Sequence, residues 1–164
     1  MEQVLSKSSE HKILIFSQFV SMLNLIRKEL TERDIPFSYL SGSTRDRSRV
    51  VQEFQEDPQQ RVFLISLKAG GTGLNLTQAD YVYLVDPWWN PAVENQAIDR
   101  VYRIGQKKNV VAVRLICPHT VEEKMMQMQQ EKKELFHDLV PTEAAMGKSF
   151  SKDELLKLLN TPLA

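Results

Sequence analysis

The sequence predicts an α/β protein with a doubly wound, mainly parallel sheet that helices cover on both faces. Short apolar runs of strand length alternate with amphipathic stretches of helical length along most of the chain. Polar and glycine-rich loops follow the runs, at 17–18, 41–44, 66–77 and 87–90. Open α/β sheets bind ligands at the carboxyl ends of their strands, so these loops predict the functional edge.

The apolar runs predict the strands. Each run is bounded by polar residues, and each is too short for an average helix. The runs span residues 12–16, 37–40, 61–67, 81–86 and 110–116.

The stretches between the first runs predict two helices. Residues 18–33 carry apolar side chains at helical spacing, and Pro36 breaks the pattern. Ser43 or Thr44 can cap a second helix over residues 45–56. The apolar side chains of the first helix are Phe19, Met22, Leu23, Ile26 and Leu30.

Two further helices are predicted in the second half. Pro91 suits the first turn of a helix that continues to about Ile104. Thr120 and Glu123 form a capping box that opens a long helix to about Leu139.

The two ends of the chain carry weaker patterns. Residues 1–10 predict a fraying tail or a linker. Residues 141–150 predict a loop, and the capping box 151–154 predicts a short docking helix rich in leucine.

The composition is that of an ordinary soluble, intracellular domain. The chain has 164 residues, 42% hydrophobic and 26% charged, with 21 basic and 21 acidic residues and a formal net charge of zero. Overall charge therefore gives no sign of a nucleic-acid partner, and such a surface would have to be local. The single cysteine, Cys117, lies in an apolar run and is expected to be a buried structural thiol rather than a metal ligand. No apolar stretch reaches the length of a membrane span, and the first residues show no apolar core typical of a signal peptide.

The predicted helix that starts at Pro91 carries a candidate anion site. At about 100° per residue, Gln96, Arg100 and Arg103 share one stripe of its surface. Two guanidinium groups on one stripe suit a triphosphate. The alternative is a solvated basic face, but residues 99–116 carry five basic groups against one acid, which favours an anion site.

The segment 66–76 follows a predicted strand and contains three glycines in four residues. Glycines such as Gly71 and Gly73 let the backbone approach a ligand closely, and exposed amides can meet phosphate oxygens. A plain tight turn is the alternative. The dinucleotide fingerprint fails because its third glycine falls at Leu76, which argues against an oxidoreductase domain.

A complete site for nucleotide hydrolysis is absent from the sequence. Residues 147–149 match the end of a phosphate-binding loop, but Thr142 stands where the loop requires glycine. Asp86 stands alone, without the second acidic residue of a Mg²⁺-binding dyad.

Trp88 and Trp89 lie in a loop bounded by prolines at a predicted strand end. One of the two is expected in the core, as most tryptophans are. A tryptophan on a surface loop beside basic groups can instead lie against a nucleic-acid backbone or sugar.

Five segments occur in the order seen in the second RecA-like lobe of Swi/Snf-type ATPases: KILIFSQF (12–19), LSGST (40–44), SLKAGGTGLNLTQAD (66–80), VDPWWNP (85–91) and QAIDRVYRIGQ (96–106). The chain resembles this branch of helicase superfamily two over roughly residues 10–140. The resemblance implies a RecA-like three-layer sandwich with a C-terminal helical extension. It implies a motor lobe at 11–119, a brace helix at 120–140, and a loop and docking helix at 141–164.

The resemblance implies nucleotide-linked roles at matching positions. Arg100 and Arg103 look like arginine fingers for ATP held on a first lobe, with Gln96 beside them on the same stripe. Gly71 and Gly73 match the motif that links nucleotide state to the grip on DNA.

The resemblance also implies a DNA-binding surface. Lys68 and Trp89 match positions that touch the DNA backbone and minor groove. Ser17, Gly42 and Ser43 match loops that follow the phosphates of one strand.

The motifs of a first lobe, which would hold ATP and Mg²⁺, are missing, so we expect an excised domain without ATPase activity of its own. The expected partners are an N-terminal RecA-like lobe of the same protein and double-stranded DNA, bound through its phosphates, and no membrane. The expected location is the bacterial cytoplasm at the nucleoid, or the nucleus in a eukaryote. The alternative function is a non-catalytic nucleic-acid or protein-binding module that kept the fold.

Overall fold

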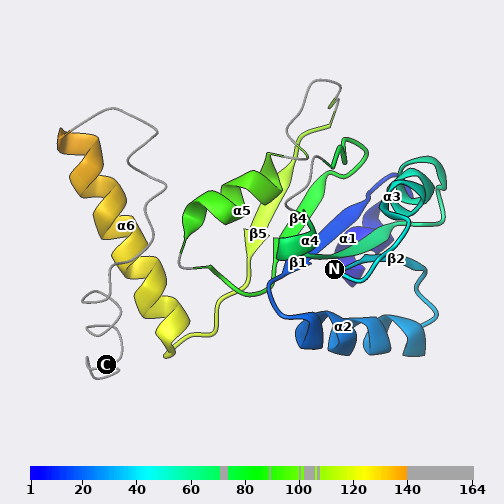
Figure 1. Ribbon diagram of the computed structural model, residues 1–164, viewed down its shortest axis with the longest axis horizontal. Coiled ribbons are helices and arrows are strands. Elements are labelled where there is room, and N and C mark those ends of the chain that lie inside the picture. Colours follow the sequence, from blue (N-terminus) through cyan, green and yellow to red (C-terminus); the bar gives the residue numbers. More distant parts are fainter. Residues whose placement is uncertain (71–73, 89, 100, 102–105, 107, 140–164) are drawn as a thin grey trace.

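A sheet of five parallel strands in the order β2-β3-β1-β4-β5 forms the centre of the protein (Figure 1). The computed structural model describes residues 1–70, 74–88, 90–99, 101, 106 and 108–139. The strands are β1 (Ile13–Ser17), β2 (Phe37–Leu40), β3 (Val62–Ser66), β4 (Tyr81–Leu84) and β5 (Val111–Arg114). The predicted parallel α/β sheet is therefore confirmed.

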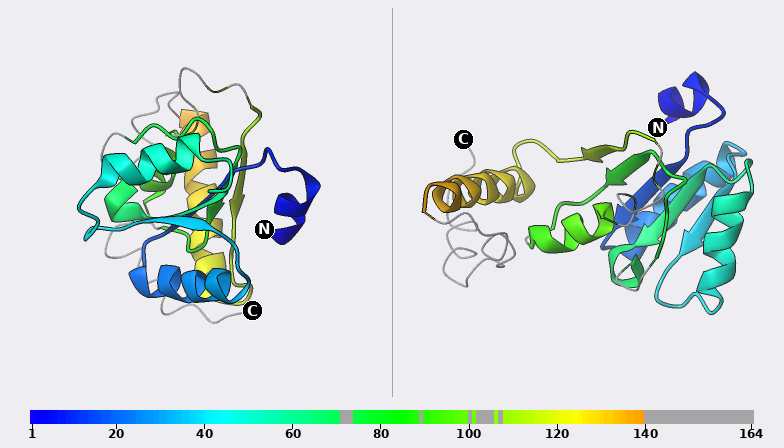
Figure 2. Two further views of the ribbon diagram at one scale, coloured as in Figure 1. Left: turned by 90° about the vertical axis from the view of Figure 1, so that its right-hand side faces the viewer. Right: turned by 90° about the horizontal axis from the view of Figure 1, so that it is seen from above.

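Helices pack on both faces of this sheet and make three layers (Figures 1 and 2). The alternation of strand residues decides which face each side chain meets. Ile13 and Ile15 of β1 pack in one cluster with α1 and α2, whereas Leu14 and Phe16 pack in another with α3, α4 and α5. These helices are α1 (Glu2–Lys7), α2 (Val20–Glu32), α3 (Arg47–Glu56), α4 (Leu67–Gly70) and α5 (Pro91–Ile98). The predicted three-layer sandwich is confirmed.

The start of α3 differs from the prediction. Its N-cap is Asp46, whose side chain accepts a hydrogen bond from the Arg49 amide at 3.0 Å. Ser43 and Thr44 are engaged in the preceding turn instead, since Thr44 Oγ1 accepts from the Ser41 amide at 2.9 Å. The helix therefore begins at Arg47, two residues later than expected.

Residues 1–10 do not form the expected tail. They contain α1, whose Val4 is 9% exposed and packs in the cluster under α2. The guanidinium of Arg61 donates to the carbonyls of Leu5 (3.0 Å), Ser8 and His11 (3.1 Å) and ties this segment to the start of β3. The prediction missed this helix because its few apolar residues give a weak pattern without the sheet beneath them.

The outer edge of the sheet at β5 is more exposed than its sequence suggested. Val111, Leu115 and Ile116 are 44%, 46% and 38% exposed, and Cys117 is exposed as well. The expectation that Cys117 is buried is therefore wrong. β5 is the last strand of the sheet, so apolar residues there have strand neighbours on one side alone.

Lys12 lies at the amino end of β1, on the opposite edge of the sheet from the predicted functional loops. Lys12 is 8% exposed, and its ammonium donates to the carbonyls of Phe54 and Asp57 (2.9 Å) at the end of α3. The same ammonium lies 4.9 Å from the centre of the Phe54 ring. Burial lowers the pKa of Lys12 from its ordinary value of 10.5. Lys12 therefore ties the end of α3 to the start of β1.

The long helix predicted after β5 is present as α6 (Val121–Leu139). Thr120 caps it by accepting from the Glu122 amide at 3.2 Å, and Glu123 accepts from the His119 amide at 2.7 Å. The predicted loop and docking helix at 141–164 lie outside the described residues. No helix in the described part of the chain is both long and apolar enough for a membrane span.

Candidate functional site

Polar residues gather where the parallel strands end, as the loop positions predicted. Ser17 ends β1, Ser41 follows β2, Ser66 ends β3 and Asp86 follows β4. All four are at most 6% exposed, and Ser17 is directly opposite Ser66 in the register of β1 and β3. This carboxyl edge is the place where open α/β sheets bind their ligands.

Asp86 joins the ends of two neighbouring strands. One carboxylate oxygen accepts from the Ser17 hydroxyl at 2.5 Å, and the other accepts from the Gln18 amide at 2.8 Å. Both oxygens therefore hold the turn that follows β1. Among the described residues, no group of three or more His, Cys, Asp or Glu side chains could hold a metal ion.

Ser17, a predicted DNA contact, has a buried side chain. Its hydroxyl also accepts from the Phe19 amide at 3.0 Å. The serine thus shapes the turn between β1 and α2, and the exposed residue of this turn is Phe19, at 54%. These bonds favour a positioning role for Ser17 behind the surface.

The turn after β2 presents the other two predicted phosphate contacts. Ser41 accepts from the Thr44 amide at 3.1 Å, and the hydroxyls of Ser41 and Ser43 are 2.9 Å apart. Gly42 and Ser43 are exposed at the tip. A Cβ added at Gly42 would meet no atom within 4 Å, so a ligand can approach this backbone closely.

The glycine-rich segment leaves β3 through the short helix α4. Lys68 in this helix is exposed, while its neighbour Ala69 is 1% exposed and packs in the core. Gly71 and Gly73 lie outside the described residues. The chain re-enters the core at Leu74 and Leu76, which are 9% and 0% exposed.

The helix that was expected to carry the arginine stripe is shorter than predicted. α5 ends at Ile98, and the Val101 amide then donates to the Ile98 carbonyl at 2.9 Å, a tighter three-residue turn. Asp99 places a negative charge at the helix C-terminus, where the helix dipole disfavours it. The helix expected to continue to about Ile104 therefore ends at Ile98, and the shared stripe of Gln96 and the two arginines stays a prediction. Gln96 is exposed on α5, and Arg100 and Arg103 lie outside the described residues.

Gln106 anchors the end of the segment 99–106, which contains both arginines. Its amide nitrogen donates to the carbonyls of Ala79 (2.9 Å) and Val101 (3.4 Å), and its oxygen accepts from the Lys108 amide at 2.8 Å. Val101 itself is fully buried. The sequence gives no sign of this role of Gln106, because a bond from a side chain to distant backbone leaves no periodic signal.

Glu94 was also missed by the sequence analysis. It is fully buried, and its two oxygens accept from the Trp88 amide and from Nε of Arg114, each at 2.6 Å. The pair joins α5 to β5 and to the tryptophan loop. Arg114 therefore does not belong to the free basic surface counted from the sequence. Trp89, the predicted minor-groove contact, lies outside the described residues, and Trp88 is half-buried.

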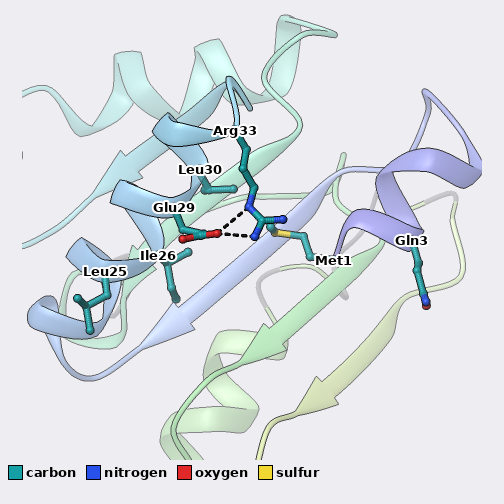
Figure 3. A pocket seen from close by; sticks show the side chains of 7 residues that line it. All are labelled: Met1, Gln3, Leu25, Ile26, Glu29, Leu30 and Arg33. Carbon is teal, nitrogen blue, oxygen red and sulfur yellow. Dashed lines mark hydrogen bonds and ion pairs between the residues drawn. The ribbon is translucent and has the colours of Figure 1, made fainter.

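A groove of about 520 Å³ lies between α1 and α2, away from this edge (Figure 3). Its walls include Met1, Leu25 and Leu30, with an ion pair between Arg33 and Glu29. α1 precedes β1, and Arg33 follows the end of α2, so the groove lies toward the amino ends of the strands. No residue predicted for the functional site lines it.

The fold and the edge define the class of protein. Residues 1–105 match the family described as the helicase conserved C-terminal domain. The chain belongs to this family, and it is the C-terminal RecA-like lobe of a Swi/Snf-type ATPase.

Relatives from several kingdoms share this lobe. "DNA repair protein RAD5B" of Arabidopsis thaliana is 46% identical over 137 residues, which are 82% of this chain and 11% of that protein. "Protein CHROMATIN REMODELING 24" of the same plant is 44% identical over 154 residues, 93% of this chain and 14% of that protein. An uncharacterized ATP-dependent helicase of Mycoplasma pneumoniae is 40% identical over 152 residues, 92% and 15% of the two chains.

A solved structure supports the fold directly. "Crystal structure of the C-terminal part of Fun30 ATPase domain" superposes with a TM-score of 0.72 at 38% identity, covering 76% of this chain and 40% of that chain. The chain thus spans a small part of the length of the relatives it matches.

Proposed function

We propose that the chain is the C-terminal motor lobe of an ATP-dependent double-stranded DNA translocase, working with a first RecA-like lobe that holds ATP and Mg²⁺. The carboxyl edge supports this proposal, because the loop of Gly42, the helix of Lys68 and helix α5 all leave the sheet there. Asp86 stands at that edge without the second acidic residue of a Mg²⁺-binding dyad, so we assign Mg²⁺ to the first lobe.

The nucleotide-linked role falls to Arg100 and Arg103. Val101, between the two arginines, is fully buried, and Gln106, three residues after Arg103, bonds back to Ala79. A segment held at such points can present guanidinium groups outward to a phosphate bound on a partner lobe. Arginine fingers contribute about 10³–10⁵ in rate by stabilising charge on the transferred phosphoryl group. Gly71, Gly73 and exposed Gln96 are proposed to line the same interface.

The DNA-linked role falls to exposed groups of the same edge. Lys68, Gly42 and Ser43 are exposed and can meet phosphates, and Trp89 is proposed to reach the minor groove. Ser17 is proposed to act from behind by holding the first turn. Binding of this kind is independent of sequence and weakens steeply with salt. Opening and closing of the two lobes during ATP turnover would alternate this grip, at the bacterial nucleoid or in a nucleus.

The test is the variant Arg103→Ala in a protein that contains both lobes. We expect DNA-stimulated ATP hydrolysis to fall by about 10³-fold or more, while ATP binding stays within about twofold because the first lobe is intact. Arg49→Ala, which removes an exposed arginine from α3, is the matched control and should hydrolyse ATP normally. The 164-residue chain alone should show no ATPase activity. Near-normal turnover by Arg103→Ala would refute the finger role, and a lack of DNA-stimulated hydrolysis in the unaltered two-lobe protein would favour a non-catalytic binding module.

A further inference from the structure

The backbone of Trp88 is held from two sides by side chains of two different helices. Its amide donates to Glu94 of α5 at 2.6 Å, and its carbonyl accepts from Nε2 of Gln129 in α6 at 2.7 Å. Both polar groups of one residue are therefore engaged by side chains that lie 6 and 41 positions away in the sequence. Backbone groups removed from water need such partners, so the two bonds fix the position of this loop.

We call these two bonds to the Trp88 backbone the clamp, and its Glu94 side is tied to the sheet. Glu94 is fully buried, and its second oxygen is bonded to Arg114 at the end of β5. β5 in turn pairs with β4, which leads into the tryptophan loop. The amide of Trp88 is thus connected to the sheet through Glu94 and Arg114.

The Gln129 side of the clamp belongs to a helix that stands apart. Figure 1 shows α6 beyond α5, away from the sheet. Met125, one turn before Gln129, is 7% exposed, and the bond of Gln129 to Trp88 brings this face of α6 to the tryptophan loop. Gln127, on another face of the same helix, is exposed.

We infer that Gln129 is a positioning residue that couples α6 to the tryptophan loop, so that a displacement of α6 releases the loop. The amide of Gln129 is neutral and makes a bond of ordinary strength. Such a bond can open without leaving a buried charge, unlike the bond of Glu94 to Arg114. The consequence for DNA, that a released loop loosens the grip, rests on the proposed function.

The clamp is tested in the 164-residue chain by hydrogen exchange at the Trp88 amide. Gln129→Glu is nearly isosteric but places an acceptor against the Trp88 carbonyl, and Gln129→Ala removes the donor. Loss of one hydrogen bond, about 1 kcal/mol, corresponds to roughly fivefold faster exchange through local opening. Gln127→Ala, the matched control, should leave the rate unchanged, and the core amide of Leu64 should be unaffected in all variants. An unchanged Trp88 amide, or equal acceleration at Leu64, would overturn the inference whatever the protein's function.

The consequence is tested in a protein with both lobes, by titrating DNA into the ATPase assay. Gln129→Glu should raise the half-saturating DNA concentration by at most about fivefold, the factor set by the same lost bond, and leave the KM for ATP unchanged. Gln127→Glu should change neither. Faster exchange with an unchanged DNA titration would overturn the link from α6 to DNA. If the unaltered protein showed no DNA-stimulated hydrolysis, the proposed function would fail, and the exchange result would still decide the clamp.

Discussion

The ion pair between the buried Glu94 and the partly exposed Arg114 predicts both the direction and the size of a change in stability. Arg114→Met keeps the apolar stem of the arginine and removes the charge that faces Glu94 at 2.6 Å. The carboxylate is then left fully buried with the Trp88 amide as its remaining hydrogen-bond donor among the contacts described above. Such a buried, unpaired charge is unfavourable.

The size of the loss follows from the burial of the two partners. Breaking a buried ion pair from one side costs about 3–5 kcal/mol. The Arg114 side chain is 36% exposed, so water can approach the vacated position, and we expect about 2–3 kcal/mol. The variant Glu94→Gln/Arg114→Met removes both charges, and the glutamine oxygen can still accept from Trp88. This double variant should therefore be more stable than Arg114→Met alone.

Urea unfolding of the three proteins at pH 7 measures these differences. Arg49→Met is the matched control, because Nε of Arg49 also bonds a glutamate, Glu53, at 2.8 Å, but both side chains are exposed. Its unfolding curve should overlay that of the unaltered chain. A loss below about 0.5 kcal/mol for Arg114→Met, or a double variant no more stable than the single one, would refute the reasoning.

Three further predictions concern the core, the amino edge and the turn after β2. Phe63→Ala, at a fully buried residue whose ring centre is 5.0 Å from that of Phe54, should cost about 3–5 kcal/mol in thermal unfolding. The pKa of Lys12 is lowered in the native chain, so above that lowered pKa the native chain has released a proton that the unfolded chain keeps up to about pH 10.5. The stability of the unaltered chain relative to Lys12→Met should therefore rise between urea titrations at pH 7.5 and pH 10. A difference in stability that stays constant with pH would contradict this prediction. Gly42→Ala should leave the unfolding free energy unchanged or raise it by about 0.4–1 kcal/mol, because the new methyl meets open space. In a protein with both lobes the same change should weaken DNA binding, measured by fluorescence anisotropy, and unaltered binding would remove Gly42 from the proposed phosphate path.

The parts of the fold that were predicted correctly depend on local patterns. The run from Ile13 to Phe16 is apolar at every position, and a strand buried on both faces requires this. The run at 37–40 matches β2 at both ends. The gathering of loops at the carboxyl edge followed from the parallel sheet alone. In these cases the signal and the structure extend over the same few residues.

The parts that were missed depend on partners distant in the sequence. Glu94 meets Arg114 and Gln129 meets Trp88 across 20 and 41 positions, and no periodicity records such pairs. The early end of α5 depends on one turn at Asp99, which a uniform helical wheel ignores. Cys117 was misjudged because an apolar run at the sheet's last strand looks the same as one at its centre.

The exposed last strand has a practical meaning for anyone who handles this lobe by itself. One side of β5 pairs with β4, and the other side has no strand beside it in the described sheet, while Val111 and Leu115 remain about half exposed. Unpaired strand edges with apolar neighbours are templates for pairing with another copy. We therefore expect the isolated lobe to self-associate through this edge as its concentration rises.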